Sequence, residues 1–188
     1  MGSAPFIVGI GGTTRVGSSG ERIVRCVLSH VEALGGETRM FGGQKLAQLP
    51  HYAPENPTRN AAQLELVEAV RRADGLVIGT PGYHGGVSGL VKNAIDLLED
   101  LREDKRVYFS DMAVGLVVVA AGWQACGVTL QAMRGIVHAM RGWPTPMGIT
   151  VNTIEQQVFD QHGEVVDPSL KSACALQAEQ VLRLAGRG

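Results

Sequence analysis

The segment with the clearest chemical pattern is residues 79–96, which reads GTPGYHGGVSGLVKNAID. It follows a short apolar run at 75–79 and leads into a helical pattern, the order in which a parallel sheet presents a loop to a ligand. A turn needs one or two glycines, but this loop has four: Gly82, Gly85, Gly86 and Gly89. The excess predicts backbone held close to a flat, polar ligand. We expect Tyr83 to pack on the ligand's face; a core aromatic at Tyr83 and a structural histidine at His84 are the alternatives.

A second segment, residues 11–20, reads GGTTRVGSSG and lies between the first apolar run and the first helical pattern. It carries four hydroxyl side chains and one guanidinium: Thr13, Thr14, Arg15, Ser18 and Ser19. Free N–H groups at a helix start, together with hydroxyls and an arginine, suit a phosphate dianion. The alternative, in which Ser18 or Ser19 only caps the helix, needs a single hydroxyl and leaves the others unexplained.

Two common nucleotide motifs do not fit residues 11–20. Gly12 to Ser18 has the glycine spacing of a P-loop, but Ser18 occupies the position of its lysine. The dinucleotide motif GxGxxG fails at Thr14, and no acidic residue ends the second predicted strand. The segment therefore favours a monophosphate over a nucleoside triphosphate or a tightly held NAD.

The third segment, residues 121–127, reads AGWQACG and follows the most apolar run of the chain. Gly122 suits close approach of a ligand and Trp123 suits a wall of its site, unless the indole only seals the end of the sheet. We assign no catalytic residue, because the sequence has no nucleophile elbow of the form GxSxG and no Ser–His–Asp spacing. A phosphate site followed by a site for a planar heterocycle describes flavin mononucleotide (FMN), which carries its own redox chemistry.

Strand-like runs that position these segments alternate with helical patterns along the whole chain. We expect strands at 6–11, 37–41, 76–78, 113–119 and 150–151, helices near 23–34, 64–70, 89–101, 130–140 and 170–184, and a loop at 44–60. Strands that are apolar on both faces are typical of a parallel sheet covered by helices on both sides. The sequence therefore predicts one doubly wound α/β domain over residues 1–188.

The composition limits the kinds of partner that this chain is expected to bind. The 188 residues carry a net charge of −1 and no long basic run, which disfavours nucleic acid as a partner. No apolar stretch reaches the roughly 20 residues of a membrane helix, and the first residues lack a signal-peptide pattern. Three widely spaced cysteines, Cys26, Cys126 and Cys174, fit neither a metal site nor a disulfide framework. We expect a cytoplasmic protein that binds neither a metal nor a membrane.

Two motifs resemble those of the NADPH-dependent FMN reductase family of the flavodoxin-like superfamily. Thr13, Arg15 and Ser18 match the family's hydroxyl-x-Arg-x-x-Ser phosphate loop. Residues 81–96 match its Pro-x-Tyr-x-x-x-x-Ser/Pro-Gly-x-x-Lys-Asn-x-x-Asp run. Two residues depart from the pattern: His84 stands where asparagine is common, and Trp123 interrupts a loop that is usually richer in glycine.

The resemblance implies a flavodoxin-like, five-stranded sheet in the order 2-1-3-4-5 with FMN along its carboxyl edge. Hydride would pass from C4 of NADPH or NADH to flavin N5, and the electrons would go on to a small-molecule acceptor, to free flavin or to a partner monooxygenase. The candidate cofactor-binding residues are Thr13, Arg15, Ser18, Ser19, Pro81, Gly82, Tyr83, His84, Gly85, Ser88, Gly122 and Trp123.

Three alternatives stay open at this point. The chain could be a quinone or azo reductase with tightly held FMN, a non-catalytic flavodoxin that carries electrons, or an interaction module without flavin. A net charge of −1 disfavours the electron carrier, because such carriers are usually acidic. The resemblance also implies a homodimer or homotetramer formed through the third helix, where Leu97, Leu98 and Leu101 are candidate contacts.

Overall fold

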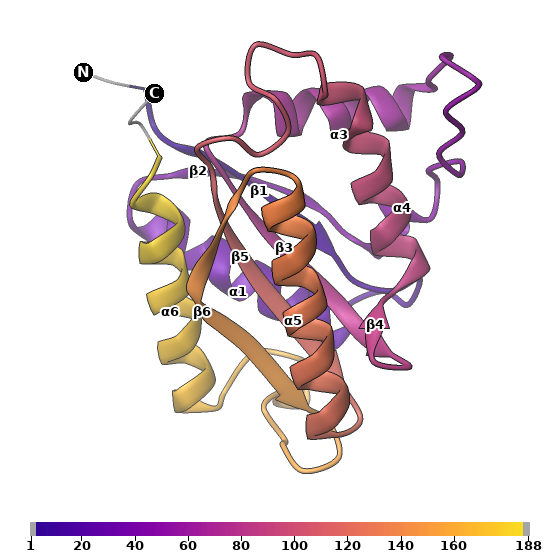
Figure 1. Ribbon diagram of the computed structural model, residues 1–188. Helices are drawn as coiled ribbons and strands as arrows, with labels where there is room; N and C mark the ends of the chain where they lie inside the picture. The colour runs from indigo at the N-terminus through magenta and orange to yellow at the C-terminus, as the bar shows by residue number, and fades with distance from the viewer. Residues whose placement is uncertain (1–2, 186–188) are drawn as a thin grey trace.

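The most apolar segments of the chain form one sheet in the computed structural model, which describes residues 3–185 (Figure 1). Its path across the sheet is β2 (Glu37–Phe41), β1 (Phe6–Gly11), β3 (Gly75–Tyr83), β5 (Ala113–Ala120) and β6 (Trp143–Asn152). Every neighbouring pair on this path is parallel. Since β3 and β5 are buried along almost their whole length, they read as continuous apolar runs. The predicted parallel sheet is confirmed.

Helices cover both faces of this sheet (Figure 1). On one face, α1 (Ser19–Ala33) and α6 (Pro168–Leu182) pack against each other and against the strands in one apolar cluster. On the other face, α3 (Ala61–Arg72), α4 (Gly89–Leu97) and α5 (Trp123–Ala139) share a second cluster. The arrangement brings the carboxyl ends of the parallel strands to one edge, where the three glycine-rich segments meet.

The predicted count of five strands in a 2-1-3-4-5 order is wrong, because the structure has a sixth strand. The short β4 (Gly86–Val87) lies off the main path and pairs antiparallel with the end of β3. His84 and Gly85 between them both have positive φ, 53° and 74°. Positive φ at both residues is the geometry of a tight two-residue hairpin. The glycine-rich loop is therefore a hairpin that projects Tyr83 and His84 past the sheet edge.

Two element boundaries also differ from the prediction. The last strand, expected at 150–151, begins at Trp143 in spite of Pro144 and Pro146. Proline is tolerated there because β6 is at the edge of the sheet and pairs only with β5. The predicted loop 44–60 begins with a one-turn helix, α2 (Gly43–Leu46), which is too short to show a period in the sequence.

The leucines proposed as contacts between subunits are in the core instead. Leu97, Leu98 and Leu101 are each at most 1% exposed and belong to the apolar cluster under α3 and α4. Leu97 is the last residue of α4, and Leu98 and Leu101 belong to the 3₁₀ helix η1 (Leu98–Leu101) that follows it. An interface through this region has to use other residues.

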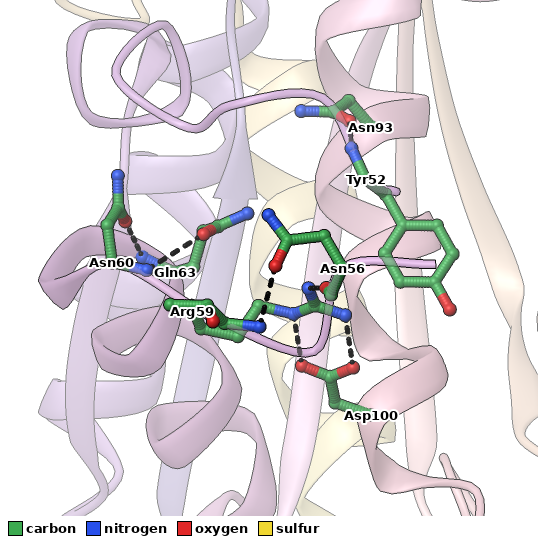
Figure 2. A network of polar contacts seen from close by, with 8 residues as sticks. Tyr52, Asn56, Arg59, Asn60, Gln63, Asn93 and Asp100 are labelled. Carbon is green, nitrogen blue, oxygen red and sulfur yellow. Dashed lines mark hydrogen bonds and ion pairs between the residues drawn. The ribbon is translucent and has the colours of Figure 1, made fainter. Parts of the chain in front are cut away.

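A polar network fastens the loop 47–60 to α4 and η1 (Figure 2). Arg59 donates two hydrogen bonds to the carboxylate of Asp100, at 2.7 and 2.9 Å, and its side chain is only 9% exposed. The backbone N–H of Tyr52 donates to Asn93 Oδ1 at 2.8 Å, and Asn93 Nδ2 donates to the carbonyl oxygen of Pro50 at 3.1 Å. The side chain of Asn93, a residue of the second sequence motif, therefore holds this loop against α4. Asp100, in η1, holds the other end of this loop through Arg59.

Candidate functional site

A cavity of about 690 Å³ opens at the carboxyl edge of the sheet. Segments that follow β1, β3, β5 and β6 contribute to its wall, as expected for a parallel sheet. The described lining residues are Gly12, Thr13, Thr14, Arg15, Ser18, Ser19, Gly20, Pro81, Gly82, Tyr83, His84, Gly85, Val119, Ala120, Ala121, Ala125 and Thr153. The structure thus brings the first two predicted segments together in one cavity.

Hydrogen bonds between neighbouring residues hold the first segment, residues 11–20, in a compact loop. Ser18 is 3% exposed and its Oγ accepts the N–H of Thr13 at 3.1 Å, while Thr13 Oγ1 accepts the N–H of Arg15 at 3.2 Å. Ser18 occupies the N-cap position of α1, yet its side chain makes no capping hydrogen bond. The first N–H groups of an α-helix have no partner within the helix. The loop therefore presents hydroxyls and free N–H groups of α1 to the cavity.

Sequence reasoning missed the support beneath this loop, which comes from Glu21 and Gly43. The carboxylate of Glu21 accepts the N–H of Gly43 at 3.3 Å and is paired with Arg25 at 2.8 Å. A Cβ on Gly43 would lie 1.6 Å from the carbonyl oxygen of Thr13, so the loop rests directly on this glycine. The signal was the Gly42–Gly43 pair after the second strand, whose partner in space no spacing rule supplies.

The second segment forms the opposite wall. Pro81 and Gly82 are buried, whereas Tyr83 is 59% exposed and His84 is exposed at the hairpin tip. A Cβ on Gly82 would lie 3.0 Å from both Ala120 Cβ and Thr129 Oγ1, so this glycine is also required by packing within the protein. Tyr83 is not a core aromatic, and its ring is free to contact a ligand.

Three predicted site residues are absent from the described lining of the cavity. Ser88 is the N-cap of α4, where its Oγ accepts the N–H of Val91 at 3.3 Å. Gly122 is the N-cap of α5 and Trp123 begins that helix, so the third segment is mostly helix. The Trp123 indole donates to Glu155 Oε2 at 2.7 Å, between the segments that follow β5 and β6. Their place in the wall is taken by Ala120, Ala121, Ala125 and Thr153, which the strand-end rule points to.

The electrostatics of the cavity favour an anion. Among the described lining residues, Arg15 is the only one with a permanently charged side chain, and no carboxylate faces the space. The volume is within the range of cofactor sites, about 300–1,000 Å³. One end offers hydroxyls, helix N–H groups and Arg15, and the other offers hairpin backbone, Tyr83 and small alanines. These donors fit a phosphate joined to a planar heterocycle, as in FMN.

The sequence model of the family described as NADPH-dependent FMN reductase matches residues 5–156. The chain belongs to this family. It is an oxidoreductase that depends on FMN and on a reduced nicotinamide nucleotide as electron donor. The match covers every segment of the cavity wall and ends before α6.

Curated relatives agree with the family. The chain is 28% identical over 148 residues to an FMN-dependent NADPH-azoreductase of Staphylococcus aureus, over 75% of this chain and 73% of the relative. It is 36% identical over 95 residues to an iron-sulfur flavoprotein of Archaeoglobus fulgidus, over 50% of this chain and 46% of that protein. The chain thus spans less than half the length of the second relative.

Solved structures show the same fold. An NADH:FMN oxidoreductase in its apo form superposes with a TM-score of 0.72 at 20% identity, over 95% of this chain and 90% of that one. A flavodoxin, WrbA-like protein of Agrobacterium tumefaciens superposes with a TM-score of 0.64 at 17% identity, over 97% and 98% of the two chains. The fold is therefore flavodoxin-like.

Residues 3–185 contain neither a cluster of metal ligands nor a helix that could span a membrane. In that range, no three His, Cys, Asp or Glu side chains gather in a way that could hold a metal ion. Over the same residues, every helix is too short or too polar to cross a membrane.

Proposed function

We propose that the cavity binds FMN, with its phosphate on residues 12–20 and its ring system against residues 81–85. The observation that carries the proposal is Arg15, the one permanently charged side chain among the described lining residues, beside the start of α1. A guanidinium and free helix N–H groups together favour a phosphate. Thr13 and Ser18 are already held in place by hydrogen bonds within the loop, so little order is lost when the phosphate binds.

The ring end of the site depends on backbone and small side chains. Pro81, Gly82 and Gly85 bring the hairpin backbone to the cavity, and Ala120 and Ala121 leave room for a planar group on the other side. Tyr83 supplies an exposed aromatic face at the rim. Offset stacking of aromatic rings contributes about 0.5–1.5 kcal/mol beyond area burial.

FMN bound here would supply the redox chemistry, namely uptake of a hydride from NADPH or NADH and transfer of the two electrons to a second acceptor. The chain's own residues bind and orient. Among the described lining residues there is no carboxylate and no cysteine, and we assign none of them as a nucleophile or a general base. His84 and Tyr83 stand at the open rim, where donor and acceptor would arrive, and we place their role in positioning these molecules.

The acceptor in this proposal is a small molecule or free flavin, and reduced flavin that leaves the protein would serve a flavin-dependent monooxygenase as partner. The S. aureus relative is named an azoreductase, which favours the second candidate, an azo or quinone reductase with tightly held FMN. The electron-carrier alternative is weaker, because the net charge is only −1. Assembly as a homodimer or homotetramer and a cytoplasmic location, suggested by three free thiols, belong to the same proposal.

A steady-state experiment tests the reductase activity and identifies the class of acceptor. FMN-loaded protein is passed through gel filtration, and NADPH oxidation is then followed with an azo dye, a quinone or added FMN as the acceptor. Turnover with any acceptor supports the reductase. Flavin that stays with the protein and electrons that reach the dye or quinone favour the second candidate, whereas flavin loss with turnover restored by added FMN favours free flavin. If neither NADPH nor NADH in its place is oxidised under any of these conditions, the proposal is overturned.

A further inference from the structure

A second cavity, of about 520 Å³, lies between α1 and the residues that lead into α6. It shares none of its described lining residues with the candidate FMN cavity. The wall is formed by Arg22, Arg25, Cys26, Ser29, His30, Gly163, Glu164, Val165 and Lys171. Residues 163–171 lie outside the range that the family model matches, so this cavity is not explained by FMN binding.

Two cysteines meet at the inner wall of this cavity. Cys26 on α1 is half-buried and lines the space, while Cys174 on α6 is fully buried behind it. Cys174 belongs to the apolar cluster between α1 and α6, and Cys26 packs against that cluster, so the two thiols are close enough to shift each other's pKa. The pair thus joins an accessible sulfur to an inaccessible one on a neighbouring helix.

The charges around the pair favour a thiolate at Cys26. Three cationic side chains and one carboxylate, Glu164, line the cavity. One of the cations, Arg25, is neutralised by an ion pair with a carboxylate outside the cavity. The hydrogen bond from Cys174, and then Lys171, lower the pKa of the Cys26 thiol, against burial and Glu164, which raise it. The same hydrogen bond and burial raise the pKa of the Cys174 thiol, which is fully buried, so Cys26 is the sulfur that a molecule in the cavity can reach.

We propose that Cys26 and Cys174 form a thiol oxidation site, at which a peroxide converts the two thiols into a disulfide between α1 and α6. The Cys26 thiolate attacks one peroxide oxygen, the O–O bond breaks, and a sulfenic acid forms with release of one water after protonation. The Cys174 sulfur then attacks Cys26 Sγ, the S–O bond breaks, and a second water leaves. In sum, two thiols and one hydrogen peroxide give one disulfide and two waters.

The third cysteine provides an internal control. Cys126 on α5 is 1% exposed, and its thiol donates to the carbonyl oxygen of Val151 at 3.5 Å. Burial is the largest influence on this thiol and raises its pKa. A buried, protonated thiol reacts slowly with peroxide, so oxidation at the proposed site should leave Cys126 unchanged.

The test uses the whole protein, freed of reductant and treated with hydrogen peroxide, followed by unfolding, alkylation and peptide mass spectrometry. We expect a disulfide-linked peptide pair that contains Cys26 and Cys174, with Cys126 fully alkylated. In Cys174→Ala, the sulfenic acid at Cys26 has no partner and is trapped by dimedone. In Cys26→Ser, which changes the more exposed position, Cys174 stays alkylatable after unfolding.

A charge variant separates the site from general thiol reactivity. Lys171→Gln should slow disulfide formation by up to about tenfold, the change in thiolate fraction for one pKa unit. Lys105→Gln, an exposed lysine away from the cavity, should leave the rate unchanged. The proposal is overturned if Cys26 is over-oxidised without forming the disulfide, if Cys126 reacts first, or if all three thiols survive peroxide that oxidises free cysteine.

Discussion

Replacing Arg15 with alanine removes the only permanently charged side chain among the described residues that line the candidate FMN cavity. Arg15 is exposed, and within residues 3–185 its guanidinium makes no hydrogen bond or ion pair with the protein. Its loss should therefore leave the free energy of unfolding nearly unchanged, within about 0.5 kcal/mol. The substitution should therefore lower the affinity for the FMN phosphate without changing the stability of the fold.

The size of that effect follows from the chemistry of the contact. A hydrogen bond to a charged group contributes about 1.5–3 kcal/mol, and each 1.4 kcal/mol is a tenfold change in Kd. Arg15→Ala should therefore weaken FMN binding by about 10- to 150-fold. Because the guanidinium is exposed to solvent, screening favours the lower half of this range and makes the loss smaller at high salt.

Flavin fluorescence provides the assay, with riboflavin as the matched ligand because it lacks the phosphate. Arg15→Ala should weaken FMN binding and leave riboflavin binding unchanged. Arg102→Ala, a change of an exposed arginine in a surface ion pair, should alter neither. Equal losses for both flavins would place Arg15 at the ring or in folding, and unchanged FMN affinity would refute the assignment of residues 12–20 to the phosphate.

Three further changes probe the site and its supports. Tyr83→Ala should lower FMN affinity or turnover while the melting temperature hardly changes, because the ring is 59% exposed; a fall in stability alone would contradict its place at the rim. Gly43→Ala should cost about 1–3 kcal/mol of stability and weaken FMN binding, since its Cβ would collide with the phosphate loop. The control is Gly135→Ala, an exposed helix position with open space around it, which should instead stabilise the protein by about 0.5–1 kcal/mol. Denaturant unfolding measures the stability of both variants. Equal effects would show that Gly43 is not tightly packed against the loop. Arg59→Met should destabilise the protein by about 3 kcal/mol, because it leaves the partly buried carboxylate of Asp100 without its partner. The control Arg102→Met should cost under about 1 kcal/mol. Similar losses for the two variants in chemical denaturation would show that the loop network contributes little to stability.

The parallel sheet and the first two cavity segments could be predicted from sequence because each depends on local pattern. Continuous apolar runs such as 113–119 identify buried parallel strands, and the carboxyl ends of such strands meet at one edge. Thr13, Arg15 and Ser18 and residues 81–85 follow directly from that rule and line one cavity. Their assignment to FMN phosphate and ring stays a prediction.

The remainder depends on contacts between distant segments. The hairpin at His84 and Gly85 is set by two positive φ angles, which the residue types permit but do not require. Gly43 supports Thr13 across a gap of thirty positions, and no spacing rule joins them. Trp123 was expected to wall the site, but α5 begins at this residue and its indole bonds to Glu155. In each of these cases tertiary contact decides the role of a residue.

The reduction of bound FMN by a nicotinamide nucleotide is tested most directly by an anaerobic half-reaction. Protein loaded with FMN is mixed rapidly with NADPH, and separately with NADH, while the visible absorbance of oxidised flavin is followed. We expect rapid bleaching with at least one donor, and the relative rates rank the two. A protein that binds FMN and keeps its yellow colour with both donors would contradict the reductase assignment, and one that does not take up FMN would contradict the cofactor site itself.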